Sequence, residues 1–136
     1  MIFVDTGAFV AHHVRGDQYH HQATRIWNQL RQNKAHCITS NFVLNETATL
    51  IGRRTSYKFA SQVVRTLYAS PHLEILRVTQ EIELKALDLF GKYGDQKVSF
   101  TDCTSFSLMQ THRLTQVFCF DRHFDAPGFI RIPLIW

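Results

Sequence analysis

Short apolar segments alternate with longer segments of helical periodicity, and this alternation limits the possible fold more than any other feature. The apolar segments lie at residues 2–4, 36–39, 73–78, 117–120 and 129–132. Between them, apolar residues recur at helical spacing over about residues 19–30, 41–52, 57–68, 80–91 and 102–112. Strands separated by helices indicate a parallel sheet that helices cover on both faces. We therefore predict a three-layer α/β/α fold with a central parallel sheet of about five strands.

Polar residues that commonly begin helices precede four of the helical segments. They are Asp17, after a loop that contains Gly16, and then Ser40, Thr79 and Thr101. No repeat, low-complexity run or linker interrupts the pattern. We expect a single domain over residues 1–136, a length that suits one hydrophobic core.

Two acidic residues directly follow predicted strands, Asp5 after residues 2–4 and Asp121 after residues 117–120. Because function in parallel α/β folds gathers beyond the carboxyl ends of the strands, both should lie at one edge of the sheet. Glu46 lies within a helical segment among apolar neighbours, and Asp102 lies in the first turn of another. Each acid also has an ordinary structural alternative. Asp5 could cap a helix and Glu46 could lie on an exposed helix face, whereas Asp102 could complement a helix dipole and Asp121 could be a loop residue.

Taken together, these four acids predict a cation site. Carboxylates repel one another, so a cluster of them persists where a cation holds it. Oxygen ligands with no histidine or thiol nearby favour Mg²⁺ or Mn²⁺. Such ions can promote in-line attack on a phosphodiester bond and stabilise the leaving oxygen.

The cysteines, the histidines and the net charge further restrict the possible chemistry and partners of the protein. The odd number of cysteines and the absence of a CxxC pair favour buried, reduced thiols at Cys37, Cys103 and Cys119. The eight histidines show no metal-ligand spacing, so structural or surface roles are expected for them. A net charge of +4 favours an anionic partner only slightly. With no apolar run of membrane-spanning length and no signal-peptide pattern, we expect no membrane association and a cytoplasmic location.

Four motifs carry a resemblance to a known family over essentially the whole chain. They are IFVDTGAFVA, NFVLNETATL, VSFTDCTSFSLM and FCFDRHF, in this order. They resemble the PIN-domain nucleases, especially the VapC-type ribonucleases of toxin–antitoxin pairs. The SFTDCTSF segment is the most specific of the matching pieces.

The resemblance implies roles for individual residues. Asp5, Glu46 and Asp102 match the three principal metal-binding acids, Asp121 matches a more variable fourth, and Thr6 matches a small polar residue that assists the first. It also implies Mg²⁺ or Mn²⁺ dependence, cleavage of single-stranded or looped RNA, frequent homodimers, and an antitoxin encoded beside the nuclease.

Basic residues near the expected site are candidates for contacts with the RNA backbone. With Thr6, those we assign to substrate binding are Arg53, Arg54, Lys97 and Arg122; Arg15 and Lys58 are weaker candidates. Specific recognition of RNA commonly stacks bases on aromatic rings, which leaves Phe9, Tyr57 and Tyr93 open as stacking residues. Asp125 is a further acid near the site, and Asp95 lies shortly before the SFTD motif without an assigned role.

Three alternatives stay open at this point. A phosphotransferase with a strand-end Asp nucleophile needs a second Asp two residues later, where this chain has Gly7. An RNA-processing nuclease of the same family would share the site but lack a toxin role. A non-catalytic RNA- or protein-binding domain of the same fold has no need for the complete set of acids.

Overall fold

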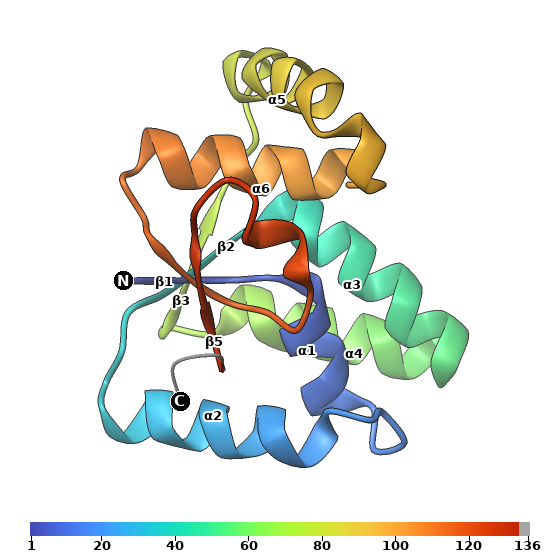
Figure 1. Cartoon of the computed structure of the whole chain (residues 1–136). Helices are drawn as coiled ribbons and strands as arrows, with labels where there is room; N and C mark the ends of the chain where they lie inside the picture. The colour runs from blue at the N-terminus through green and yellow to red at the C-terminus, as the bar shows by residue number, and fades with distance from the viewer. Residues whose placement is uncertain (134–136) are drawn as a thin grey trace.

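The computed structural model describes residues 1–133, whose five strands form one sheet between layers of helices (Figure 1). All neighbouring strands are parallel, and their order is β3-β2-β1-β4-β5. The strands are β1 (Ile2–Val4), β2 (Cys37–Ser40), β3 (Leu73–Leu76), β4 (Gln116–Phe118) and β5 (Ile130–Ile132). The predicted fold class is confirmed. The expected domain extends to residue 136, so its last three residues lie outside the described part.

Helices cover both faces of the sheet. In Figure 1, α6 with α5 outside it lies above the sheet, and α2 lies below it. The helices are α1 (Thr6–His13), α2 (His20–Gln32), α3 (Asn41–Arg54), α4 (Tyr57–Ala69), α5 (Gln80–Lys92) and α6 (Phe100–Thr111). Two short 3₁₀ helices, η1 (Gly94–Gln96) and η2 (Arg122–Phe124), precede α6 and β5. Within residues 1–133 no helix is long and apolar enough to cross a membrane.

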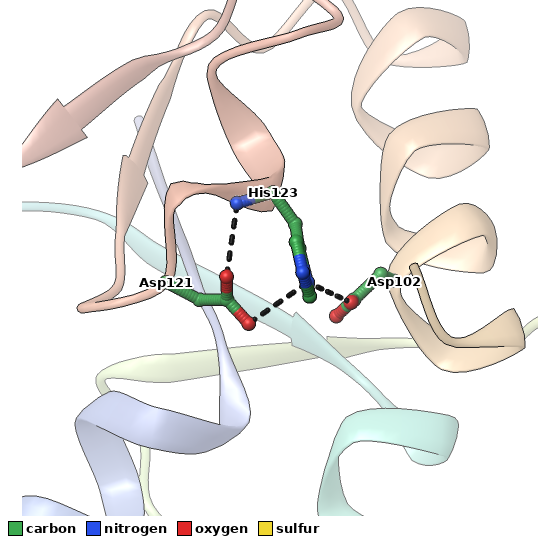
Figure 2. Close-up of side chains that lie close together, drawn as sticks. All are labelled: Asp102, Asp121 and His123. Carbon is green, nitrogen blue, oxygen red and sulfur yellow. Dashed lines mark hydrogen bonds and ion pairs between the residues drawn. The ribbon is translucent and has the colours of Figure 1, made fainter. Parts of the chain in front are cut away.

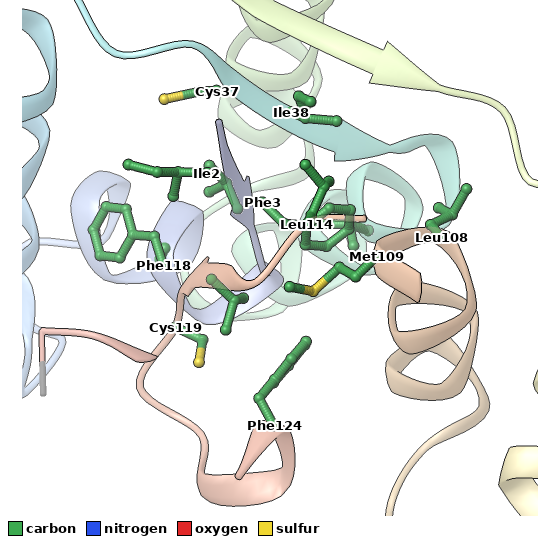
Figure 3. Packing of buried hydrophobic residues seen from close by; sticks show 14 of the residues in the cluster. Ile2, Phe3, Cys37, Ile38, Leu108, Met109, Leu114, Phe118, Cys119 and Phe124 are labelled. Atoms are coloured by element: carbon green, nitrogen blue, oxygen red, sulfur yellow. The ribbon is translucent and has the colours of Figure 1, made fainter. Parts of the chain in front are cut away.

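The core surrounds the two central strands, β1 and β4. Phe3 and Val4 of β1 and Val117 and Phe118 of β4 are completely buried, as is usual for strands that helices cover on both faces. Figure 3 shows part of this cluster, which also includes residues from β2, α6 and η2. The three cysteines are buried and form no disulfide, as predicted.

Helix α1 was not predicted, because its sequence lacks a polar face. Within TGAFVAHH, the residues Thr6, Ala8, Phe9, Val10 and Ala11 are all buried. A helix that is buried on most sides shows no amphipathic periodicity, which is the signal that reveals a surface helix. The segment expected to be a loop after Asp5 is therefore mostly helical.

Several predicted boundaries were also wrong. Asp17 does not cap α2; its Oδ1 accepts a hydrogen bond from the Tyr19 amide at 2.9 Å, and α2 begins at His20. Helix α6 is capped by Ser99 and not by Thr101. Strand β4 ends at Phe118, so two residues separate it from Asp121. Ser40 and Thr79 cap their helices as predicted.

Candidate active site

Asp5 lies at the carboxyl end of the central strand β1, at the N-cap position of α1. Its side chain makes no capping hydrogen bond, which removes the helix-cap explanation for this residue. The carboxylate is buried, and its Oδ1 has no hydrogen-bond partner among the described residues. Burial raises the pKa of Asp5 well above its usual value; the charges of Asp102, Glu46 and Asp121 raise it further, and the Thr6 amide lowers it.

Glu46 extends from the middle of α3 toward the same place. The residue is half-buried, and burial raises the pKa of its carboxyl group. The hydroxyl groups of Thr6 and Thr101 lower that pKa, whereas the charges of Asp102 and Asp121 raise it. The carboxyl group of Glu46 is thus within electrostatic range of Asp102 and Asp121, and its partial burial agrees with the apolar neighbours in the sequence, which predicted that it is not fully exposed.

Asp102 performs a structural task as well as joining the cluster. It is the third residue of α6 and forms a capping box: the Ser99 hydroxyl accepts the Asp102 amide at 3.0 Å, and Asp102 Oδ2 accepts the Ser99 amide at 3.3 Å. Burial raises the pKa of Asp102, and the hydrogen bond from His123 opposes this increase. The helix-start alternative is thus correct for Asp102, but it does not exclude a role in the site.

Asp121 reaches the cluster from the loop after β4. Its Oδ1 accepts a hydrogen bond from the His123 amide at 2.9 Å, and its Oδ2 lies 3.0 Å from the His123 ring nitrogen Nδ1. Figure 2 shows the His123 ring between Asp121 on one side and Asp102 on the other. The Asp121 side chain is 43% exposed, so Asp121 lies on the solvent-exposed side of the cluster, whereas the buried Asp5 lies on its inner side.

His123 contradicts the expectation that no histidine lies near the acids. Its Nδ1 is 3.1 Å from Asp102 Oδ2 as well as 3.0 Å from Asp121 Oδ2. The sequence held a signal: His123 follows Asp121 by two residues in FDRHF. The adjacent pairs His12–His13 and His20–His21 are more conspicuous in the sequence, but adjacent residues on a helix point about 100° apart, which works against a shared ion.

The donor set is suitable for a divalent cation. Asp102, Asp121 and His123 each offer one ligand atom, and these atoms lie within 4.8 Å of one another. Asp5 lies outside this group of three, but its buried Oδ1 has no partner, and a nearby cation would offset the desolvation of its carboxylate. The negative charges of its neighbours raise the pKa of Asp5, and that of Asp121 raises the pKa of Asp102; a cation would relieve such repulsion.

The basic residues predicted to contact substrate are exposed, and one of them is engaged in an ion pair. Arg53, Lys97 and Arg122 are exposed, and Arg122 lies directly beside Asp121. Arg54 pairs with Asp17 at 2.6 Å. The weaker candidates Arg15 and Lys58 are exposed.

Other expected contributors differ in accessibility. Thr6, which was predicted to bind substrate, is buried, and its hydroxyl has no hydrogen-bond partner among the described residues. Of the three aromatic candidates, Phe9 and Tyr93 are buried, and Tyr57 is 75% exposed. The Asp125 carboxylate pairs with Arg131 at 2.7 Å.

A separate cavity of about 610 Å³ lies away from the acids, at the amino ends of the strands. It is lined by Phe9, Trp27 and Leu30, and by Cys37 and Leu73, the first residues of β2 and β3. The acid cluster lies at the opposite, carboxyl end of the sheet.

Comparison with known proteins identifies the family. The PIN domain family model matches residues 2–130. The 23S rRNA-specific endonuclease VapC20 of Mycobacterium tuberculosis is 33% identical over 132 residues, which are 97% of this chain and 98% of that protein. The crystal structure of M. tuberculosis VapC20, described as a toxin that cleaves the sarcin–ricin loop, superposes with a TM-score of 0.87 and 32% identity over 96% of this chain and 97% of that one.

More distant structures share the fold. DNA-bound VapBC from Salmonella typhimurium has a TM-score of 0.68 at 14% identity, over 96% of this chain and 97% of that one. PAE2754 from Pyrobaculum aerophilum has a TM-score of 0.67 at 12% identity, over 98% and 90%. The match over nearly the full length, at both sequence and structural level, shows that the chain belongs to the PIN-domain family and, within it, to the VapC-type endoribonucleases.

Proposed function

We propose that this protein is a metal-dependent endoribonuclease that hydrolyses RNA phosphodiester bonds at the cluster of Asp5, Glu46, Asp102 and Asp121. The observation that carries the proposal is the convergence of four carboxylates from β1, α3, α6 and the loop after β4 around a buried oxygen of Asp5 without a partner. A purely structural cluster would neutralise these acids with Lys or Arg, and among the described residues none of the four forms an ion pair with either.

The four acids would hold Mg²⁺ or Mn²⁺, the ions that carboxylate oxygens suit. When bound, such an ion supplies Lewis-acid stabilisation of charge on the phosphate and lowers the pKa of water. Asp5 and Asp102 are fixed by burial and by the capping box, and therefore keep their position without reorganisation. Arg122, Lys97 and Arg53 are exposed near the site and would bind the RNA phosphates.

We propose a structured loop of 23S rRNA as the substrate. The proposal rests on VapC20, which is named for that specificity and superposes over nearly the whole chain. Primer extension on ribosomes treated with the purified protein would locate the cut. Cleavage of other RNAs while 23S rRNA stays intact would contradict this substrate assignment but not the nuclease.

The test of the chemistry is a pair of glutamate substitutions. Glu46→Gln keeps the shape of the side chain and removes its charge, so cleavage should fall at least about 100-fold while the fold is retained. Glu74→Gln is the matched control, because Glu74 is an exposed acid on β3 that pairs with His36. Cleavage by the unmodified protein should require Mg²⁺ or Mn²⁺ and stop in EDTA. Full activity in EDTA, or in Glu46→Gln, would refute the proposal.

We further propose that the protein is the toxin of a toxin–antitoxin pair in the cytoplasm, with a small co-encoded antitoxin, and that it forms a homodimer. VapC20, described as a toxin, supports the first part. Leu84, Leu87 and Phe90 form an exposed apolar stripe on α5, which supports self-association. Expression alone should slow growth, and harmless expression of active protein would favour an RNA-processing role instead. Sedimentation equilibrium would give the oligomeric state.

A further inference from the structure

We infer that His123 is a nitrogen ligand of the metal site, so that this protein binds its ion through mixed oxygen and nitrogen donors. The inference rests on the proposed function, since it concerns the same ion. It departs from the all-carboxylate site that the sequence predicted. It also assigns a ligand to the FDRHF segment beyond Asp121.

The position of the ring nitrogen carries the inference. His123 Nδ1 lies 3.1 Å from Asp102 Oδ2 and 3.0 Å from Asp121 Oδ2. Ligand atoms in adjacent positions of an octahedral ion, each about 2.1 Å from the metal, are separated by about 3 Å. The two separations from the ring nitrogen therefore match those of neighbouring ligands around one ion, and the three ligand atoms all lie within 4.8 Å of one another. A single ring nitrogen carries at most one proton, so it cannot give both carboxylates a full hydrogen bond.

The surrounding chain holds His123 in this position. Phe124, the next residue, is completely buried, and its ring packs edge-on against Phe106 at 4.9 Å between centroids. The His123 amide donates to Asp121 Oδ1, which fixes the turn between the two residues. The backbone on both sides of His123 is thus held in place, and its ring contacts both carboxylates.

Asp5 gives an independent indication that the cluster suits a cation. Its carboxylate is more than nine-tenths buried, and Oδ1 has no hydrogen-bond partner. The charges that act on it are those of Asp102, Glu46 and Asp121. His123 is the one basic group among the described residues that contacts this cluster, and it contacts only Asp102 and Asp121. A cation held by Asp102, Asp121 and His123 would reduce the negative charge that acts on Asp5.

A nitrogen ligand has consequences for metal preference. Imidazole binds Mn²⁺ and later transition metals better than it binds Mg²⁺, which prefers oxygen. The protein should therefore discriminate for Mn²⁺ more strongly than an all-carboxylate site. Replacing His123 by a carboxylate should reduce that discrimination while leaving an ion-binding site in place.

Pulsed electron paramagnetic resonance of bound Mn²⁺ tests this directly, without measuring activity. The full-length protein should show modulation from a directly bonded nitrogen, and the frequencies should change when histidine is labelled with ¹⁵N. The signal should vanish in His123→Asp and persist in His112→Asn. His112 is an exposed residue at the opposite end of α6 from Asp102. His123→Asn serves as a second variant if His123→Asp fails to fold, as judged by circular dichroism.

Calorimetric titration with Mn²⁺ and with Mg²⁺ gives the second readout. The ratio of Mg²⁺ to Mn²⁺ dissociation constants should fall at least about tenfold in His123→Asp and stay unchanged in His112→Asn. Mn²⁺ binding without nitrogen modulation would overturn the inference and leave the nuclease proposal intact, with His123 as a positioning residue for Asp102. Absence of Mn²⁺ binding to the unmodified protein would overturn both.

Discussion

At the scale of single residues, the cluster stores electrostatic strain. Burial raises the pKa of Asp5, Glu46 and Asp102, and the neighbouring acids raise these pKa values further. A raised pKa means that the folded state binds the proton more tightly than the unfolded chain does. These groups therefore support folding below about pH 4, and the support is lost as pH rises through their folded-state pKa values. Near neutral pH the metal-free cluster opposes folding.

Asp5→Asn should relieve this strain in the metal-free protein. Asp5 is the best site for the test because its Oδ1 has no partner, whereas Asp102 is partly compensated by Ser99 and His123. In EDTA at pH 7.5 we expect the melting temperature to rise by about 3 °C or more, since relief of about 1 kcal/mol shifts a chain of this size by roughly that amount. At pH 5 the difference should shrink.

Asp88→Asn, an exposed position on α5, is the control and should change the melting temperature little at either pH. Added Mn²⁺ should raise the melting temperature of the unmodified protein and of Asp88→Asn, and that of Asp5→Asn far less. A variant at Asp5 that melts several degrees below the unmodified protein in EDTA would show that the carboxylate is needed for the fold.

The acids could be predicted as candidate site residues because of where they lie in the sequence. Asp5 follows an apolar strand, and Glu46 lies among apolar neighbours where a purely solvated acid is costly. The role of His123 could not be predicted in the same way. Its place depends on η2, a short turn anchored by the burial of Phe124, and on the packing of that turn against α6. Tertiary contacts of this kind leave no periodic signal.

At the scale of elements, the start of α6 connects stability to the site. The Ser99 cap and the Asp102 carboxylate belong to the same capping box, so the helix terminus and the acid hold each other in place. Helix α4 has a matched cap without an acid, where the Ser56 hydroxyl accepts the Phe59 amide at 3.1 Å. The two helices therefore allow the contribution of a cap to be separated from a contribution to the site.

Ser99→Ala and Ser56→Ala should each lower the free energy of unfolding by about 1 kcal/mol, the usual contribution of a serine cap. Only Ser99→Ala should also weaken Mn²⁺ binding and slow RNA cleavage, by about tenfold, because it frees Asp102. Urea denaturation and calorimetric titration measure the two effects. Equal losses of metal affinity in both variants would mean that global stability, and not the capping box, controls the site.

The boundaries of the helices and strands could be predicted less well than the elements themselves. Strands and amphipathic helices were found because burial on one face imposes a period. Helix α1 was not predicted because it is buried on nearly all sides, between the sheet, α2 and α3. The α6 cap was misplaced by two residues because Ser99 and Thr101 are equally good caps by type. Only the capping box with Asp102 distinguishes them.

At the scale of the whole molecule, four of the acidic residues belong to the site, and basic residues outnumber the acids in the rest of the chain. Fifteen Lys and Arg face only seven acids outside the four of the cluster, an excess of eight. A bound cation would neutralise part of the central negative charge and leave the basic excess to attract RNA. The net charge of +4 thus understates the attraction that a polyanion experiences at the surface.

Helix α3 provides one direction for the RNA along that surface. Arg53 follows Glu46 by seven residues, which is two helical turns, so both lie on the same face about 10 Å apart. Arg54 is turned by about a further 100° and pairs with Asp17. Although both arginines were predicted to bind substrate, this geometry favours Arg53 as the residue that contacts a phosphate near the cleaved bond.

Salt dependence of RNA binding should separate the two arginines. In a Glu46→Gln background, which should bind RNA without cutting it, affinity should fall as salt rises because each phosphate contact releases counterions. Arg53→Gln should reduce the slope of log affinity against log salt by about 0.7, the value for one contact with single-stranded RNA. Arg54→Gln should change the slope less, and Lys85→Gln on α5, whose ammonium group faces Glu81, should not change it. If Arg54→Gln lowered the slope as much as Arg53→Gln while the fold was retained, the RNA would have to displace Asp17, and its path would cross the loop between α1 and α2 instead of following α3.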